Sequence, residues 1–173
     1  MKKLIYFACM LVGLFMMTSC EKDEIGGTAT QSLAGEWYVV ADAVDANGNV
    51  VAEDFFGAGR FLLSTYNTAA NKATEMWIDD NGNFWEFKIK LSCDTQNLTF
   101  QSNGAVANVA YDGCDVTIEG GKIVVGGAET PHGTKADYIE FYVSFSDDDY
   151  PASNGFDKYK ISGYRYTGLT EDD

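Results

Sequence analysis

The single histidine of the chain is the first residue to consider for catalysis. His132 lies between Pro131 and Gly133, in a segment typical of a loop. Nucleophilic hydrolysis needs a base within hydrogen-bond reach of a Ser, Thr or Cys, and donors for the oxyanion. The chain contains no G-x-S-x-G motif, and no partner for His132 is visible in the sequence. We therefore expect a loop histidine and no catalytic residues, with a hydrolase as the weakest alternative.

Two acidic runs are candidates for binding a metal ion. Residues 79–81 read Asp-Asp-Asn, and residues 147–149 are three aspartates. Calcium needs several oxygen ligands from one loop, but neither run has the spacing of an EF-hand. The first run is typical of a turn and the second of a solvated acidic tip. We therefore expect no bound metal and no cofactor.

The four cysteines fall into two groups. The first nineteen residues carry Lys2 and Lys3 ahead of an apolar run that is short for a membrane span, which predicts an export signal over residues 1–19. Cys9 would leave with this signal and Cys20 would begin the mature chain. Cys93 and Cys114 then remain as unmodified thiols in an oxidising compartment, so we expect one disulfide between them. As metal ligands they lack the further His or Cys partners that zinc requires.

The residues around Cys20 indicate lipidation. Residues 17–20, Met-Thr-Ser-Cys, resemble the lipobox of bacterial lipoproteins, with Met17 where Leu is usual. The resemblance implies acyl chains on Cys20 and attachment to a membrane. Residues 21–24, EKDE, look like the surface-export tag of some Gram-negative lipoproteins, which implies an outer membrane lipoprotein exposed to the periplasm or on the cell surface. The alternatives are a plain secretory signal or a membrane anchor, followed by a solvated tether.

The composition is strongly acidic, with 26 acidic and 12 basic residues and a net charge of −14. Loss of the signal would remove Lys2 and Lys3 but no acid, so the mature chain would carry a charge near −16. Such a surface repels phosphate backbones, which excludes nucleic acid as a partner. Contact with a membrane is expected through acyl chains and not through a basic face.

Beyond a Gly/Ser/Thr-rich tether that ends at residue 32, apolar residues alternate with a period of two, which is typical of strands. Two segments place apolar side chains on one face most clearly: Trp85, Phe87, Ile89 and Leu91, and then Ile139, Phe141, Val143 and Phe145. Asn81-Gly82 predicts a tight hairpin between strands 74–80 and 84–93. Further reversals are expected at the pairs Asn47-Gly48, Gly120-Gly121 and Gly126-Gly127.

The pattern predicts one all-β domain over residues 33–173, with about eight or nine antiparallel strands in a barrel or, alternatively, a β-sandwich. Residues 33–40, LAGEWYVV, resemble the first strand of lipocalins and related calycins. In those proteins the Trp of Gly-x-Trp closes the barrel floor against an Arg from the last strand. The resemblance implies that Trp37 and Arg165 form a cation–π pair there. In an unrelated sandwich Trp37 would instead face solvent.

A second resemblance covers most of the mature chain. The segments YNTAA (66–70), MWID (76–79), FW (84–85) and GYRYTG (163–168) together look like a family of small bacterial lipoproteins described as lipid-binding putative hydrolases. The resemblance implies a lipocalin-like barrel with a hydrophobic ligand inside. A hydrolase acting on a lipid-like substrate is the weaker alternative that the resemblance implies, because no motif in this chain supports that part of the description.

Apolar strand faces supply the candidate ligand-lining residues, which are Phe61, Leu63, Met76, Ile78, Trp85, Phe87, Ile89, Phe141, Val143 and Phe145. In a filled barrel they are core, whereas in a barrel open at one end they line a pocket. The leading hypothesis is a lipid-anchored, non-catalytic barrel that binds a small hydrophobic molecule. In the alternative, the barrel is filled and the outward-facing Tyr142, Tyr164 and Tyr166 bind a glycan or a protein.

Overall fold

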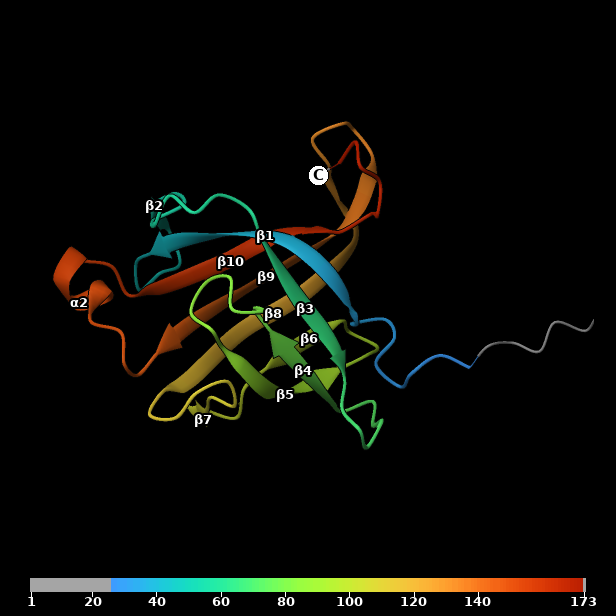
Figure 1. Ribbon diagram of the computed structural model, residues 1–173, viewed down its shortest axis with the longest axis horizontal. Coiled ribbons are helices and arrows are strands. Elements are labelled where there is room, and N and C mark those ends of the chain that lie inside the picture. Colours follow the sequence, from blue (N-terminus) through green and yellow to red (C-terminus); the bar gives the residue numbers. More distant parts are fainter. Residues whose placement is uncertain (1–25, 173) are drawn as a thin grey trace, which may run out of the picture.

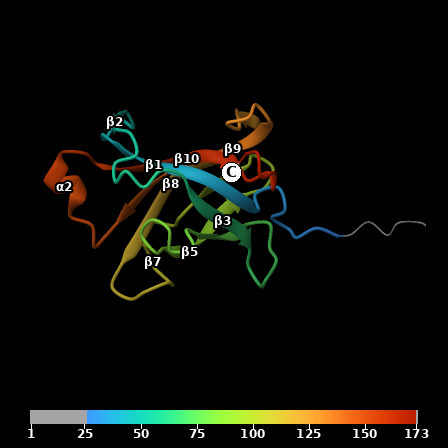
Figure 2. The ribbon, with the colours of Figure 1, turned by 45° about the horizontal axis from the view of Figure 1, so that its top comes forward.

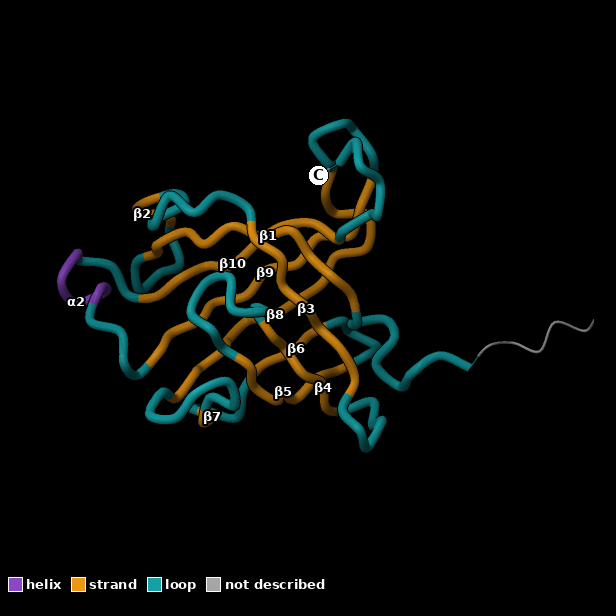
Figure 3. The backbone as a smooth tube through the Cα atoms, viewed as in Figure 1, coloured by secondary structure: helices purple, strands orange, loops and turns teal. Residues whose placement is uncertain are grey.

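The computed structural model describes residues 26–172, which fold into ten strands and one short helix (Figure 1). The strands are β1 (Gly35–Val44), β2 (Val50–Ala52), β3 (Phe61–Asn67), β4 (Glu75–Asp79), β5 (Lys88–Asp94), β6 (Thr99–Gln101), β7 (Val106–Ala107), β8 (Asp115–Glu129), β9 (Lys135–Phe145) and β10 (Lys158–Arg165), and the helix is α2 (Tyr150–Asn154). Figure 3 shows how little of the chain is helical.

Eight of the strands close into an antiparallel barrel. The order is β10-β9-β8-β6-β5-β4-β3-β1, and β1 pairs with β10 to complete the ring. Strand β2 extends β1 outside this ring, and β7 pairs with β8. The predicted single antiparallel barrel is therefore confirmed, and the sandwich alternative is wrong.

Alternation along each strand separates the core from the wall. On β9, Ile139, Phe141, Val143 and Phe145 are buried while the residues between them are partly exposed. This is the pattern that the sequence predicted, and it arises because successive side chains of a strand point to opposite faces. The inward faces of all eight barrel strands together form one hydrophobic core.

Two predicted reversals are bulges within one strand. Gly120-Gly121 and Gly126-Gly127 both lie inside β8, where the register with β9 shifts. Gly120 and Gly126 have φ values of 62° and 63°, which glycine adopts without a Cβ penalty. The glycine pairs therefore bend a fifteen-residue strand around the barrel and do not end it.

The predicted tight hairpin is also longer than expected. Asn81 and Gly82 do have positive φ, but strand pairing ends at Asp79 with Lys88, so that residues 80–87 form a loop. Trp85 lies in this loop and not on the strand face that it was predicted to share with Phe87. Glu86, with φ at 54°, breaks the alternation between them.

On the outer wall, charged side chains join β8, β9 and β10. The Glu140 carboxylate forms ion pairs with Lys122 at 2.7 Å and with Lys160 at 3.2 Å. It also accepts a hydrogen bond from the Tyr138 hydroxyl at 2.8 Å. Burial alone would raise the pKa of Glu140, but these partners outweigh it and hold the pKa at about 2. Glu140 therefore stays ionised at neutral pH and ties three strands together.

The predicted signal, Cys20 and the first part of the tether lie outside the described residues. Among residues 26–172, no helix has the length and apolar character needed to cross a membrane.

Candidate functional site

One end of the barrel is closed by the two residues that the sequence paired. Trp37 on β1 lies directly opposite Arg165 on β10 in the antiparallel register. The guanidinium carbon of Arg165 lies 4.3 Å from the centroid of the Trp37 ring, and Trp37 is 0% exposed. Because opposite residues of a strand pair project to the same face, closing the barrel brings this cation–π contact inside. We call this end the floor.

Hydrogen bonds hold both floor side chains in place. Trp37 Nε1 donates to Thr65 Oγ1 at 2.9 Å, and that hydroxyl donates to the carbonyl of Leu33 at 2.7 Å. Arg165 donates from Nε to Asp137 at 3.0 Å and from a terminal nitrogen to the carbonyl of Ala34 at 2.6 Å. The buried indole nitrogen of Trp37 and the Thr65 hydroxyl are thus paired, and the partly exposed guanidinium of Arg165 is held in place.

The floor explains the glycine of the Gly-x-Trp motif. A Cβ at Gly35 would lie 2.1 Å from the Arg165 guanidinium, which is closer than atoms can approach. Only glycine therefore leaves room for the guanidinium above Trp37.

The opposite end carries a cluster of aromatic side chains, which we call the mouth. Its members are Phe55, Phe56, Phe84, Trp85, Phe145, Tyr150, Phe156 and Tyr159. Most of the cluster is partly or fully buried, but Phe56 is 39% and Tyr150 is 49% exposed. Their ring centroids are 5.1 Å apart at 90°. Tyr150 is the first residue of α2, the helix at the left of Figure 1. Exposed aromatic rings at a barrel end can bind an apolar group from solvent.

A buried carboxylate builds one side of the mouth. Asp80 is 0% exposed and accepts hydrogen bonds from four backbone N–H groups of the loop, those of Gly82, Phe84, Trp85 and Phe87, at 2.7–3.1 Å. These bonds fix the loop that presents Phe84 and Trp85. The sequence predicts a turn residue or a metal ligand at Asp80, but in the structure its carboxylate is occupied by hydrogen bonds from the backbone. The described residues contain no cluster of three or more metal-ligating side chains.

The acidic run 147–149 borders an open hollow of about 340 Å³ beside the mouth. Asp147 accepts hydrogen bonds from Trp85 Nε1 at 3.1 Å and from the Tyr111 hydroxyl at 2.7 Å. Asp148 Oδ1 accepts from the backbone N–H of Tyr150 at 2.8 Å. The hollow is lined by Trp85, Asp147, Asp148, Asp149, Tyr150, Ser153 and Asn154.

The predicted ligand-lining residues do not share one environment. Nine of them are only 0–7% exposed, namely Phe61, Leu63, Met76, Ile78, Phe87, Ile89, Phe141, Val143 and Phe145. A cavity large enough for water would leave such side chains exposed to it, so in this structure the barrel interior around them is filled. Trp85, by contrast, reaches the hollow at the mouth.

The outward tyrosines do not form a flat exposed strip. Tyr164 and Tyr166 pack edge to face against Tyr38, and the Arg60 guanidinium lies 5.3 Å from the Tyr38 ring and 5.8 Å from the Tyr164 ring. Tyr142 is covered by the Lys158 ammonium at 5.6 Å. All three predicted platform residues are therefore only partly exposed.

The predicted disulfide does not form, because Cys93 and Cys114 are both free thiols. Cys93 pairs with Phe100, which pairs with Gly121, seven residues from Cys114 along β8. At about 3.3 Å per residue this places the cysteines roughly 20 Å apart, whereas a disulfide needs Cα atoms within about 7 Å. Cys93 lines an open hollow of about 430 Å³ over β5, β6 and β8.

His132 is exposed in the loop between β8 and β9, at the upper right of Figure 1 and away from the mouth. No hydrogen bond within residues 26–172 joins it to a hydroxyl or a thiol, so the described contacts give it no nucleophile to activate.

The closed ring of eight antiparallel strands and the Trp37–Arg165 floor define a lipocalin-like β-barrel. A family model described as lipid-binding putative hydrolase matches residues 22–170, and the chain therefore belongs to that family. This confirms the resemblance seen in the sequence. A comparison with curated proteins found no significant match.

Proposed function

We propose that the protein binds a small lipid-like molecule at the mouth, with the apolar part of the ligand against Phe56, Trp85 and Tyr150. The observation that carries this proposal is the exposure of Phe56 and Tyr150 on an aromatic cluster whose other members are partly or fully buried. Membership of a lipid-binding family supports an apolar ligand. Because the interior is filled, a ligand would rest on the mouth or displace its rings, and would not enter a preformed central cavity.

A ligand can displace the rings of the mouth because α2, which carries Tyr150, is weakly anchored. The helix has five residues, and none of them is buried. It ends at Gly155 in a left-handed conformation and leads back into β10. A segment with few buried contacts opens at low cost, so a ligand would gain apolar contacts without breaking the core.

Removal of the two exposed rings should weaken binding of a lipid-like ligand. In calorimetric titration with a neutral monoacylglycerol of ten carbons, Phe56→Ala combined with Tyr150→Ala should weaken binding about tenfold or more, since each ring contributes contact area. Val125→Ala, at a 72% exposed position on the distal part of β8, is the matched control and should leave binding unchanged. Equal binding by both variants, or no binding by the unmodified protein, would refute a ligand site at the mouth.

We further infer that the protein is an outer membrane lipoprotein held by acyl chains on Cys20, exposed to the periplasm or on the cell surface. The described chain begins beside the floor, where Ala29 donates to Asn71 at 2.8 Å and Ser32 to Thr95 at 3.3 Å. Figures 1 and 2 both place this end opposite α2. An anchor at Cys20 would therefore attach the floor end and leave the mouth accessible to ligands from the aqueous side.

Cys20→Ala should release the protein from the membrane fraction, because the acyl chains would have no sulfur to join. Cell fractionation and uptake of a labelled fatty acid measure this directly. Cys9→Ala, which changes a cysteine within the predicted signal, should leave anchoring intact. A Cys20→Ala protein that still sediments with membranes, beside an unmodified protein that takes up no label, would contradict the anchor.

A further inference from the structure

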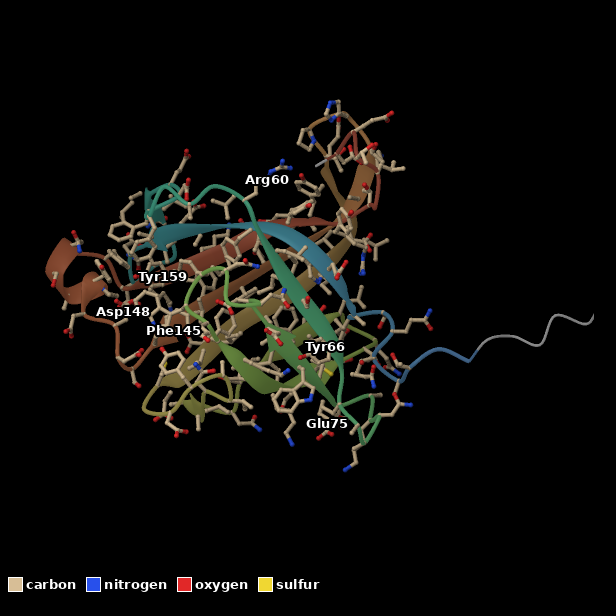
Figure 4. All side chains as sticks on the ribbon, in the orientation of Figure 1. Arg60, Tyr66, Glu75, Phe145, Asp148 and Tyr159 are labelled. Atoms are coloured by element: carbon tan, nitrogen blue, oxygen red, sulfur yellow. The ribbon has the colours of Figure 1, made fainter. Side chains whose placement is uncertain are left out.

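An open hollow of about 680 Å³ lies on the outer side of the floor. It is bordered by the turn of residues 28–32, by the turn of residues 95–98 between β5 and β6, and by parts of β8, β9 and β10 that include Arg165. The mouth is at the other end of the barrel, where Figure 4 labels Phe145 and Tyr159. The volume is within the range of small-molecule sites, so this hollow is a candidate binding site separate from the mouth.

Polar side chains around the hollow have hydrogen-bonding capacity that the protein does not use. Within residues 26–172, the side chains of Thr28, Gln31 and Thr95 make no hydrogen bond. Arg165 donates from Nε and from one terminal nitrogen at the floor, whereas no described residue accepts from its other terminal nitrogen. All four side chains are at least partly exposed, so water satisfies them in the free protein and the hydroxyl groups of a ligand can replace that water.

The charges at the hollow are balanced. Arg165 Nε lies 3.0 Å from Asp137 Oδ2, and among the described residues that line the hollow these two alone are ionisable. An anion would be attracted by Arg165 but repelled by Asp137 and by the net charge of −14 on the chain. A cation would be repelled by the guanidinium. A neutral polar ligand meets neither repulsion, so charge favours a neutral ligand here.

Apolar side chains complete the lining. Ala29 and Leu98 are partly buried, and Val125 is 72% exposed. The hollow therefore offers an apolar patch beside groups that donate and accept hydrogen bonds. A sugar ring matches this combination, because it has an apolar C–H face and a rim of hydroxyls that can both donate and accept. An acyl chain would instead displace water from the polar groups without replacing its hydrogen bonds.

We propose that this hollow binds a neutral oligosaccharide. The free terminal nitrogen of Arg165 and the side chains of Gln31 and Thr95 form hydrogen bonds with the sugar hydroxyls, and Leu98 and Val125 contact the C–H face. The inference goes beyond the proposed function and does not depend on it, because the lipid-like ligand binds at the opposite end. A free oligosaccharide and the sugar headgroup of a glycolipid both supply this chemistry.

Titration followed by amide NMR spectra of the Cys20→Ala protein, which has no sulfur to carry acyl chains, tests the site with three trisaccharides. Maltotriose and cellotriose are neutral, and trigalacturonate is anionic. At least one neutral trisaccharide should shift the signals of residues 28–32 and 95–98, with a Kd of about 1 mM or tighter. Trigalacturonate should bind about fivefold more weakly or worse. Binding of trigalacturonate as tight as that of the neutral sugars, or shifts confined to the mouth, would overturn the proposal.

Vesicles distinguish the two sources of the sugar. Flotation of the same protein is compared between phosphatidylcholine vesicles and phosphatidylcholine vesicles that contain a neutral digalactosyl lipid. Stronger flotation with the galactolipid supports a headgroup ligand, whereas binding of the trisaccharides alone supports a free oligosaccharide. If no neutral trisaccharide binds and the galactolipid adds nothing to flotation, the sugar site is refuted, and titration with the monoacylglycerol still tests the mouth independently.

Gln31→Ala supplies the variant test, with Gln96→Ala as its matched control. Gln96 is also an exposed glutamine, in the neighbouring turn, but it does not line the hollow. Gln31→Ala should weaken binding of the neutral sugar about threefold or more, because one hydrogen-bonding side chain is lost, whereas Gln96→Ala should leave binding unchanged. Both variants should retain the melting temperature and the affinity for the monoacylglycerol. Equal sugar affinities in the two variants would show that the sugar does not occupy this hollow.

Discussion

Trp37→Ala is expected to destabilise the domain by about 3 to 5 kcal/mol, because it removes a fully buried indole that the surrounding strands cannot replace. It also leaves the Thr65 hydroxyl without a donor and the Arg165 guanidinium without a ring beneath it. For a domain of this size the melting temperature should fall by about 10 °C or more. Trp77→Ala is the matched control, because Trp77 is a partly exposed tryptophan on the outer wall of β4 and should cost far less.

The same experiment measures whether the floor acts as a unit. Arg165→Ala should also destabilise the protein, since it leaves Asp137 and the Ala34 carbonyl without their donor. Because Trp37 and Arg165 are in contact, the double variant should differ from the sum of the singles by about 0.5 to 3 kcal/mol. Additive losses in four unfolding curves would show that the two side chains do not form a common floor.

Asp80→Asn should cause the second large loss of folding stability, about 2 to 5 kcal/mol, because it disrupts the loop that builds one side of the mouth. Four backbone N–H groups share the two carboxylate oxygens, and an amide would place an NH₂ donor against two of them. The loop that carries Phe84 and Trp85 should then loosen. Denaturant unfolding measures the stability, and quenching of tryptophan fluorescence by added iodide measures the exposure of Trp85.

Asp112→Asn supplies the control for this change. Asp112 is exposed in a turn, so the same substitution there should alter stability by no more than about 0.5 kcal/mol. If Asp80→Asn were as mild as Asp112→Asn, the carboxylate would not be the element that fixes the loop, and the geometry of the mouth would need another explanation.

We infer that the two ends of the barrel have different roles: the floor stabilises the fold, and the mouth binds the lipid-like ligand. At the floor, a cation–π pair and its hydrogen bonds seal the core, and Gly35 makes room for them. At the mouth, the aromatic rings of Phe56 and Tyr150 remain exposed. Clustered exposed aromatic rings mark a binding surface, which is why the mouth is the better candidate site for an apolar ligand.

The sequence by itself determined the all-β class and the buried strand faces, and its resemblance to lipocalins favoured a barrel with a Trp37–Arg165 floor. Alternation on segments such as 139–145 fixes which face is buried, because the side-chain period of a strand is two and does not depend on distant contacts. The floor pair was implied by the resemblance of residues 33–40 to lipocalins, and parity placed Arg165 on the inward face of the last strand. In the structure β1 and β10 are neighbours, and Trp37 lies opposite Arg165.

Only the tertiary structure decided the rest. Trp85 continues the strand pattern in sequence, but Asp80 captures the backbone N–H groups that the strand would have used and turns Trp85 into the mouth. Gly120 and Gly126 read as turns, but their pairing with β9 makes them bulges. The sequence predicts a disulfide between Cys93 and Cys114, but the two thiols are free and lie in different parts of the domain. In each case a local pattern was compatible with two conformations, and long-range pairing selected one of them. Whether the interior is filled is likewise set by the sum of side-chain volumes around the closed ring, which no single segment contains.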